Sequence, residues 1–359
     1  MIKKFLFIIN GEGLGNSTRC QAIMEELHNL KSEIKIITSG VGHWFYSDHK
    51  LFNQLVRIEQ IPYAESVGKI NIHKTFFNLF TIRKNIKKNI SIINDTIKTF
   101  KPNVIVTDSI YFLSSIKPKS IPVISINNAD LTIDEYFNNS KDRPKSIRSH
   151  FYFVELMDYL YHLVFADIIL SPALIKKTEK SKKKKIIKIG PIVRNQVLLS
   201  KKKIKIGKKL FMMSGSRFGN KWMMEEGIIF PKQSYVLGVE NDKISKINNV
   251  ILLGRHKHNL DHIIDADFFI TNGGYSAVTE AICLNRPLLV CPIPNHSEQW
   301  TNAKQIENSN IGMISSAGDF NKKVNEFIKK KNFYLENFSR LNIEPTGAEE
   351  AKKIIFDNC

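Results

Sequence analysis

Cysteine is scarce in this chain, and its spacing carries no signature of a disulfide framework or a metal site. The four cysteines are Cys20, Cys283, Cys291 and Cys359, and none stands in the closely paired spacing of a zinc knuckle. We therefore expect neither disulfides nor a cysteine-bound metal. A reducing, cytoplasmic environment suits such a chain.

Long apolar runs are also missing. No stretch of about 18 uncharged apolar residues occurs, so no membrane-spanning helix is expected. The apolar run at residues 5–9 follows two lysines, but it is shorter than the roughly 7–15 residues of a signal-peptide core and ends at Asn10. We interpret it as a buried strand, and we expect any membrane contact to be peripheral.

Acidic residues are outnumbered by basic ones. Asp and Glu total 34 against 53 Lys and Arg, which gives a net charge of +19. Such an excess attracts phosphates, nucleic acid or anionic lipid. Abundant Lys, Ile and Asn are equally typical of a low-GC genome, so codon usage remains an alternative source of the charge. The lysine runs lack interleaved aromatic residues, and we expect no nucleic acid partner.

The length predicts two domains. A chain of 359 residues exceeds the roughly 250–300 at which a single hydrophobic core stops growing. Apolar runs alternate with helical patterns in both halves, which predicts an α/β fold with parallel sheets. A lysine-rich run at residues 176–185 suggests the boundary. We predict Rossmann-like domains over residues 1–185 and 186–344, and a terminal helix over 345–359 that can pack back on the first domain.

The periodicity of apolar residues places the individual elements. Strands are predicted at residues 4–10, 34–39, 56–61, 104–108, 123–127 and 167–171, and then at 210–214, 235–239, 250–253, 268–271 and 288–291. Helices are predicted at residues 18–30, 72–100, 147–165, 276–284, 297–308, 321–330, 333–341 and 348–356.

In each half the first strand runs into a glycine turn. Glycines allow close backbone approach, and free N–H groups at a helix start can bind an anion. The first turn has G-x-G-x-G spacing and no acidic ribose partner, which disfavours a dinucleotide-dependent dehydrogenase. Glycines that only make tight turns remain the alternative. The candidate phosphate-binding residues of the two turns are Gly13, Gly15, Gly215, Ser216 and Arg217.

The most specific segment spans residues 267–303. A buried strand ends before Gly273 and Gly274, and the N–H groups of Tyr275 and Ser276 then open a helix that can face a diphosphate. Glu280 follows Ser276 by one helical turn on the same face, where a carboxylate can accept both hydroxyls of a ribose.

A further helix in this segment is predicted to begin near residue 297. It delivers Glu298 and Gln299 toward the same cleft, with acceptors and donors suited to sugar hydroxyls. His296, just before them, could donate to a phosphate or sugar oxygen, as could Arg217, although His296 could equally be a surface loop residue. A simple helix cap remains the alternative for residues 297–299.

Residues 267–303, together with residues 11–20, resemble the signature of the GT-B glycosyltransferases, in particular glycosyltransferase family 28 and related UDP-glycosyltransferases. The resemblance implies two domains facing across a cleft, a nucleotide-sugar donor such as a UDP-N-acetylhexosamine, a glycan or lipid-linked acceptor, and inversion at the sugar. It also implies the residue roles, with residues 273–276 and Ser216 on the diphosphate, Glu280 on the ribose, and Glu298 with Gln299 on the sugar. Fixed dipoles can stabilise the leaving group, so no metal or other cofactor is expected.

The catalytic base is an open question. Many relatives in the resembled group place a histidine where this chain has Asn16, and an amide cannot take a proton at neutral pH. The base could be Glu12 or Asp108, or a histidine such as His43, or the activity has changed or been lost. Asp108 ranks first because it ends a strand at the carboxyl edge of the sheet, although it could be a helix cap. A nucleotide-sugar hydrolase and a non-catalytic nucleotide-sugar binder are therefore alternatives.

Residues 147–165 are unusually aromatic. Core packing explains such a pattern most simply, but an exposed aromatic face beside many lysines would suit a lipid-linked acceptor at an anionic membrane. We expect a cytoplasmic protein, with peripheral association at the inner face of the cell membrane as a hypothesis.

Overall fold

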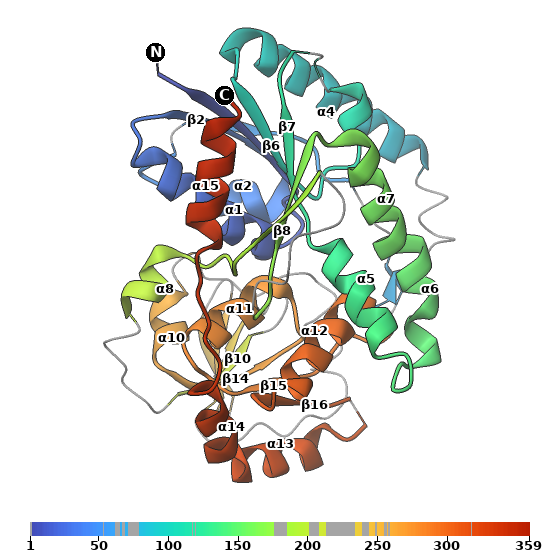
Figure 1. Cartoon of the computed structure of the whole chain (residues 1–359), viewed down its shortest axis with the longest axis vertical. Helices are drawn as coiled ribbons and strands as arrows, with labels where there is room; N and C mark the ends of the chain where they lie inside the picture. Colours follow the sequence, from blue (N-terminus) through green and yellow to red (C-terminus); the bar gives the residue numbers. More distant parts are fainter. Residues whose placement is uncertain are drawn as a thin grey trace.

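The computed structural model describes residues 2–52, 54–61, 65–66, 69–70, 79–116, 118, 120–175, 185–200, 208–212, 234–238, 244–247, 250–254, 257, 259–316 and 318–359. These residues form two α/β domains, each built around a seven-stranded sheet with helices on both faces (Figure 1). The prediction of two Rossmann-like α/β domains is confirmed.

The first sheet is parallel throughout, in the order β3-β2-β1-β6-β7-β8-β9. Its strands are β1 (Lys4–Ile9), β2 (Glu33–Thr38), β3 (Leu55–Arg57), β6 (Val104–Asp108), β7 (Val123–Ile126), β8 (Ile168–Pro172) and β9 (Ile186–Ile189). Alternate residues of β1 enter different cores, because successive side chains of a strand point to opposite faces. Phe5 and Phe7 pack with α1 (Leu14–His28), whereas Leu6 and Ile8 pack with α4 (Leu79–Phe100).

The remaining helices of the first domain are α2 (Gly40–Tyr46), α5 (Ala129–Asn138), α6 (Arg148–His150) and α7 (Leu156–Phe165). The helix predicted at residues 147–165 is not uniform, because a π-helical turn, Phe151–Glu155, joins α6 to α7. Such turns occur frequently at functional sites.

The second sheet has the order β12-β13-β11-β10-β14-β15-β16, and only its edge pair β12 and β13 is antiparallel among the described strands. Its strands are β10 (Lys208–Met212), β11 (Ser234–Leu237), β12 (Ser245–Ile247), β13 (Val250–Gly254), β14 (Ala266–Thr271), β15 (Leu288–Val290) and β16 (Gly312–Ile314). Its helices are α8 (Asn195–Ser200), α10 (Leu260–Ile264), α11 (Tyr275–Cys283), α12 (Ser297–Asn308), α13 (Phe320–Lys329) and α14 (Lys331–Phe338).

The predicted boundary after residue 185 needs correction. Strand β9 pairs in parallel with β8, so the first sheet continues to Ile189. The lysine-rich run therefore precedes the last strand of the first domain. The chain also returns to that domain at its end, where α15 (Gly347–Asp357) places Ala351 and Ile355 in the core beside α1 (Figure 1).

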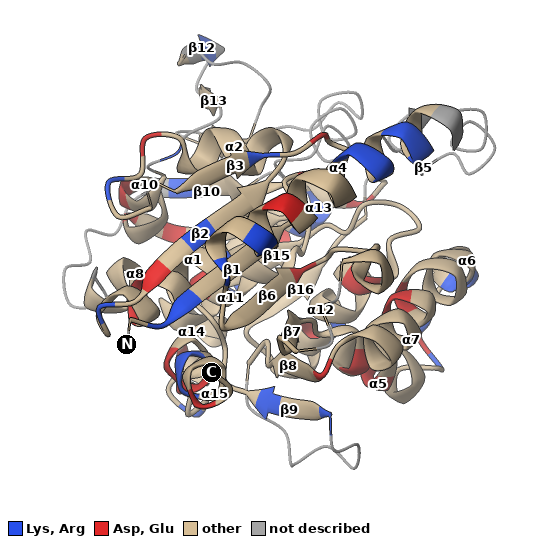
Figure 2. Ribbon diagram, turned by 90° about the horizontal axis from the view of Figure 1, so that it is seen from above, with Lys and Arg blue, Asp and Glu red and all other residues tan. Residues whose placement is uncertain are grey.

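Part of the basic excess lies on α4, where exposed lysines and an arginine appear as separate blue segments in Figure 2. Within the part of the chain that the structure describes, no helix combines the length and the apolarity needed to span a bilayer.

Candidate functional site

The two domains meet at their glycine turns. Helix α1 begins after Gly13 and helix α11 begins after Gly274, and neither N-cap residue makes a side-chain capping bond. The hydroxyl of Ser276 donates to the carbonyl oxygen of Gly15 at 2.8 Å. Two helix N-termini, each with free N–H groups and a positive dipole end, therefore lie next to each other at the domain junction.

The turn before α11 requires glycine at its first position only. Gly273 has φ +92°, and a Cβ there would lie 2.8 Å from Cγ1 of Val290 and 3.0 Å from the carbonyl oxygen of Gln299. The side chain of Asn302 donates to the carbonyl oxygen of Gly273 at 2.9 Å, which ties the turn to α12. Gly274 has open space at its Cβ position, so a ligand can approach the backbone there.

The side chain of Tyr275 has a structural role that the sequence did not indicate. Its buried hydroxyl donates to the carbonyl oxygen of Ala173 at 2.9 Å and accepts from the N–H of Ile192 at 3.2 Å. Burial raises the pKa of Tyr275 to about 12. The phenol thus joins α11 to the first domain, and the backbone N–H is what this residue can offer a diphosphate.

Glu280 lies in a buried ion pair with Arg194. Nε of Arg194 donates to Oε1 at 2.7 Å and Nη2 donates to Oε2 at 3.1 Å. The pair leaves a further lone pair on each carboxylate oxygen, so the predicted ribose contact remains chemically open. Arg194 was not predicted from the sequence as a site residue. The only indication was its position four residues after Gly190.

Asp108, the first-ranked candidate for the base, lies in a buried ion pair with Arg19. It is fully buried, and Arg19 donates to it twice, from Nε at 2.9 Å and from Nη2 at 2.6 Å. The Cys20 thiol lies 3.5 Å away, and burial followed by the charge of Asp108 raises its pKa. Burial acts to lower the pKa of Arg19, but the charge and hydrogen bonds of Asp108 outweigh it and raise that pKa. Both carboxylate oxygens of Asp108 therefore accept charge-assisted hydrogen bonds from Arg19.

The other candidates from the first glycine turn remain near the junction. Glu12 lies partly buried on the loop between β1 and α1, and its backbone N–H donates to Oδ1 of Asn10 at 3.2 Å. Asn16 lies partly buried in the first turn of α1. Gly215, Ser216 and Arg217 lie outside the described residues.

Glu298 and Gln299, the two residues at the start of α12 that are predicted to bind the sugar, have different surroundings. Oε1 of Gln299 accepts the N–H of Ile293 at 2.9 Å, so this side chain fixes the preceding loop. Burial raises the pKa of Glu298, and so do the charges of Asp158 and Asp108, while Arg19 opposes them. Because these three neighbours belong to the first domain, the carboxyl of Glu298 lies at the domain junction.

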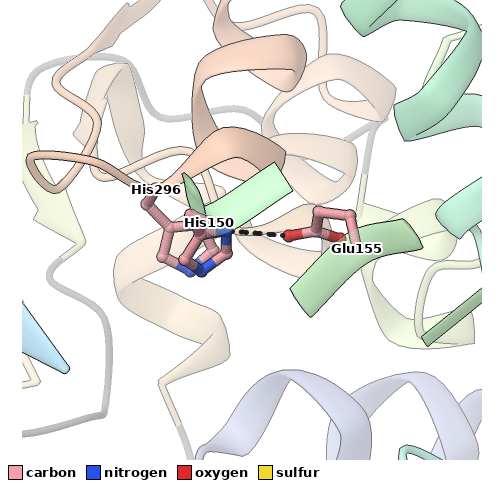
Figure 3. A group of neighbouring side chains, drawn as sticks. All are labelled: His150, Glu155 and His296. Carbon is pink, nitrogen blue, oxygen red and sulfur yellow. Dashed lines mark ion pairs between the residues drawn. The ribbon is translucent and has the colours of Figure 1, made fainter. Parts of the chain in front are cut away.

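His296 belongs to a cluster that the sequence did not predict (Figure 3). Its ring lies against that of His150, with centroids 4.5 Å apart, and Nδ1 of His150 lies 3.4 Å from Oε1 of Glu155. Burial lowers the pKa of His150 to about 4, and burial together with His150 lowers that of His296 to about 3. Burial and the charges of Glu298 and Asp158 raise the pKa of Glu155. The segment that contains His150 and Glu155 was interpreted from its aromatic residues, so neither residue was predicted as part of a site.

The fold and the glycine junction together define a GT-B glycosyltransferase. The sequence model of glycosyl transferase family 1 matches residues 3–331, and the chain belongs to this family.

Relatives agree with this assignment. An uncharacterized glycosyltransferase of Methanosarcina acetivorans is 24% identical, with 98% of this chain and 97% of the relative aligned. Another, from Methanosarcina mazei, is 26% identical over 87% of this chain and 86% of its own length.

Solved structures share the fold at low identity. MurG of Acinetobacter baumannii superposes with a TM-score of 0.58 at 13% identity, covering 99% of each chain. Phytolacca americana UGT2, complexed with UDP-2-fluoro-glucose and pterostilbene, gives a TM-score of 0.61 at 11% identity, covering 99% of this chain and 98% of that one.

We expect Asp108→Asn to destabilise the protein by about 3–5 kcal/mol, because it leaves the buried Arg19 cation without its counter-charge. Urea unfolding measures the change. The double variant Arg19→Gln, Asp108→Asn is the control, and it should recover part of the loss because no unpaired charge remains. An Asp108→Asn chain of wild-type stability that has lost turnover would contradict this view and restore Asp108 as the base.

Proposed function

We propose that this protein transfers a sugar from a UDP-linked donor, such as a UDP-N-acetylhexosamine, to a glycan or lipid-linked acceptor in the synthesis of cell-surface glycoconjugates. The observation that carries the proposal is the contact between Ser276 and Gly15, which brings the N-termini of α1 and α11 together. A donor diphosphate at this junction would receive backbone N–H groups from both domains.

With the donor diphosphate at this junction, the proposed reaction is a displacement at the anomeric carbon of the sugar. The acceptor hydroxyl attacks the anomeric carbon, a new carbon–oxygen bond forms, and the bond to the diphosphate oxygen breaks, so that UDP leaves. Fixed N–H groups and dipoles stabilise the negative charge that develops on the leaving group, which needs no metal at the diphosphate. A single displacement from the opposite face inverts the configuration at that carbon.

A nucleotide-sugar donor has further support from the complex of Phytolacca americana UGT2 with UDP-2-fluoro-glucose, since that protein shares the fold. The two helix N-termini are the feature of this chain that would bind the same diphosphate group. The identities of the donor sugar and of the acceptor are part of this proposal.

Glu12 is the base that we propose. Asp108 is neutralised by Arg19, and the amide of Asn16 cannot accept a proton at neutral pH. Glu12 lies on the loop at the carboxyl end of β1, beside the residues that begin α1. Open α/β sheets bind their ligands at this edge.

We expect Glu12→Gln to lower kcat by about 10²–10⁴-fold, because a positioned base contributes that much, with little change in affinity for UDP. The assay measures UDP release from a mixture of UDP-sugars, with and without candidate acceptors. Glu336→Gln, an exposed change on α14, is the matched control. Release without acceptor would indicate a hydrolase, and UDP binding without turnover in the wild type would indicate a binder.

Glu280→Gln should weaken UDP binding by about 10-fold or more, because charge-assisted hydrogen bonds to the ribose hydroxyls are each worth roughly 1.5–3 kcal/mol. Calorimetric titration compares UDP with inorganic diphosphate, which has no ribose. The affinity for diphosphate should change little. An equal loss for both ligands would mean that Glu280 only holds Arg194 in place.

The aromatic segment carries an exposed apolar surface. Phe153, Met157, Leu160 and Val164 are 71%, 56%, 45% and 65% exposed, and their spacing places them along one side of α7 and the turn before it. Exposed basic residues, including Arg148, lie at its beginning. This apolar stripe favours contact with a lipid-linked acceptor at an anionic membrane.

We expect the double variant Phe153→Ser, Val164→Ser to bind vesicles of phosphatidylglycerol and phosphatidylcholine at least about 10-fold more weakly than the wild type, because two exposed apolar side chains that would enter the bilayer are lost. Co-sedimentation measures the bound fraction. Leu199→Ser with Phe333→Ser, which removes two apolar side chains that are 75% and 50% exposed elsewhere, is the control. Wild-type binding that is equal on pure phosphatidylcholine would contradict an anionic membrane.

A further inference from the structure

Two histidines and a glutamate from both domains converge beside the start of α12 (Figure 3). His150 ends α6 and Glu155 ends the π-helical turn of the first domain, whereas His296 is the N-cap residue of α12 in the second. One ligand atom from each of the three residues lies within 4.8 Å of the other two. We propose that His150, Glu155 and His296 bind a divalent transition-metal ion such as Zn²⁺ and that this ion ties the two domains together.

The separation of the groups is close to what such an ion requires. Zinc binds imidazole nitrogen and carboxylate oxygen at about 2.0–2.2 Å in a tetrahedron, which places neighbouring ligand atoms roughly 3.3–3.6 Å apart. Nδ1 of His150 and Oε1 of Glu155 are already 3.4 Å apart. The ring of His296 lies tilted at 34° to that of His150. A turn of this ring about its side-chain bonds would bring a nitrogen closer to the other two ligands.

The donor set and the local charge favour a transition-metal cation. Two imidazoles with one carboxylate suit Zn²⁺, Ni²⁺ or Co²⁺ better than Mg²⁺ or Ca²⁺, which prefer oxygen ligands alone. Glu155 is buried and interacts electrostatically with Glu298 and Asp158. A divalent cation would offset the repulsion among these carboxylates.

A serine hydroxyl contacts two of the three proposed ligands. Oγ of Ser297 lies 2.8 Å from Nδ1 of His150 and 3.4 Å from Oε1 of Glu155. The ion would replace this hydroxyl as the link between the two side chains. Removal of the hydroxyl therefore leaves all three ligands in place and takes away their competitor.

The inferred role does not depend on which sugar is transferred. The ion would connect α6 and the π-helical turn with the N-terminus of α12, directly beside Glu298. Binding to the folded chain at a site made by both domains stabilises the arrangement in which they are joined. The ion would thus favour the arrangement in which the two domains are joined, without contacting the diphosphate.

The test uses the full chain without an affinity tag, in a Cys359→Ser background that removes the exposed thiol. After treatment with a chelator, Zn²⁺ binding is measured by calorimetry and by metal content after dialysis, and Co²⁺ is used as a spectroscopic probe. We expect one Zn²⁺ per chain, a raised Tm, and the visible absorption of tetrahedral Co²⁺. His150→Gln, His296→Gln and Glu155→Gln should each lower the affinity at least about 10-fold.

His28→Gln, a change at an exposed histidine of α1, is the matched control and should bind Zn²⁺ as the wild type does. Ser297→Ala should bind Zn²⁺ equally well or more tightly. Three outcomes would each overturn the proposal. The first is loss of binding in Ser297→Ala, and the second is full binding in His150→Gln. The third is a wild-type chain with less than one Zn²⁺ and no tetrahedral Co²⁺ spectrum. The last outcome requires no variant to fold.

Discussion

The contact between the two glycine turns is the constraint on which the site depends. One hydrogen bond, from Ser276 to Gly15, marks the place where helices of separate domains begin side by side. The positive φ of Gly273 and the hydrogen bond from Asn302 hold one of these turns against α12. Both helices begin after a glycine, which has no side chain to cap the first N–H groups, so these groups can face an anion at the junction.

Buried ion pairs surround this junction and limit what its carboxylates can do. Arg19 holds Asp108, and Arg194 holds Glu280, in each case through two donor atoms. Such pairs contribute little net stability, yet breaking one leaves an uncompensated charge. These ion pairs hold secondary-structure elements in place. They fix the first turns of α1 and the side of α11 that face the junction.

Several features were predictable because they depend on local pattern. The apolar runs of β1 and β14 and the glycines at residues 273–274 predicted buried strands followed by helices, and the structure has them. The boundary was misplaced because a lysine-rich run resembles a linker, whereas strand pairing put β9 into the first sheet. The strand-end position of Asp108 is visible in the sequence, whereas its bonds to Arg19 are not. Arg194, His150 and Glu155 lacked any clear signal, since their partners lie far away along the chain.

The sequence by itself determined the two-domain α/β class, the glycine turns and the helix starts that can face a diphosphate, because these follow from periodicity and from the conformational freedom of single residues. Only the tertiary structure decided which charged groups are available. Partners such as Arg19 with Asp108, or His150 with Ser297, are 89 and 147 residues apart and meet through packing of whole elements. A side chain's chemistry depends on burial and on the charges beside it, and both are properties of the folded domains together.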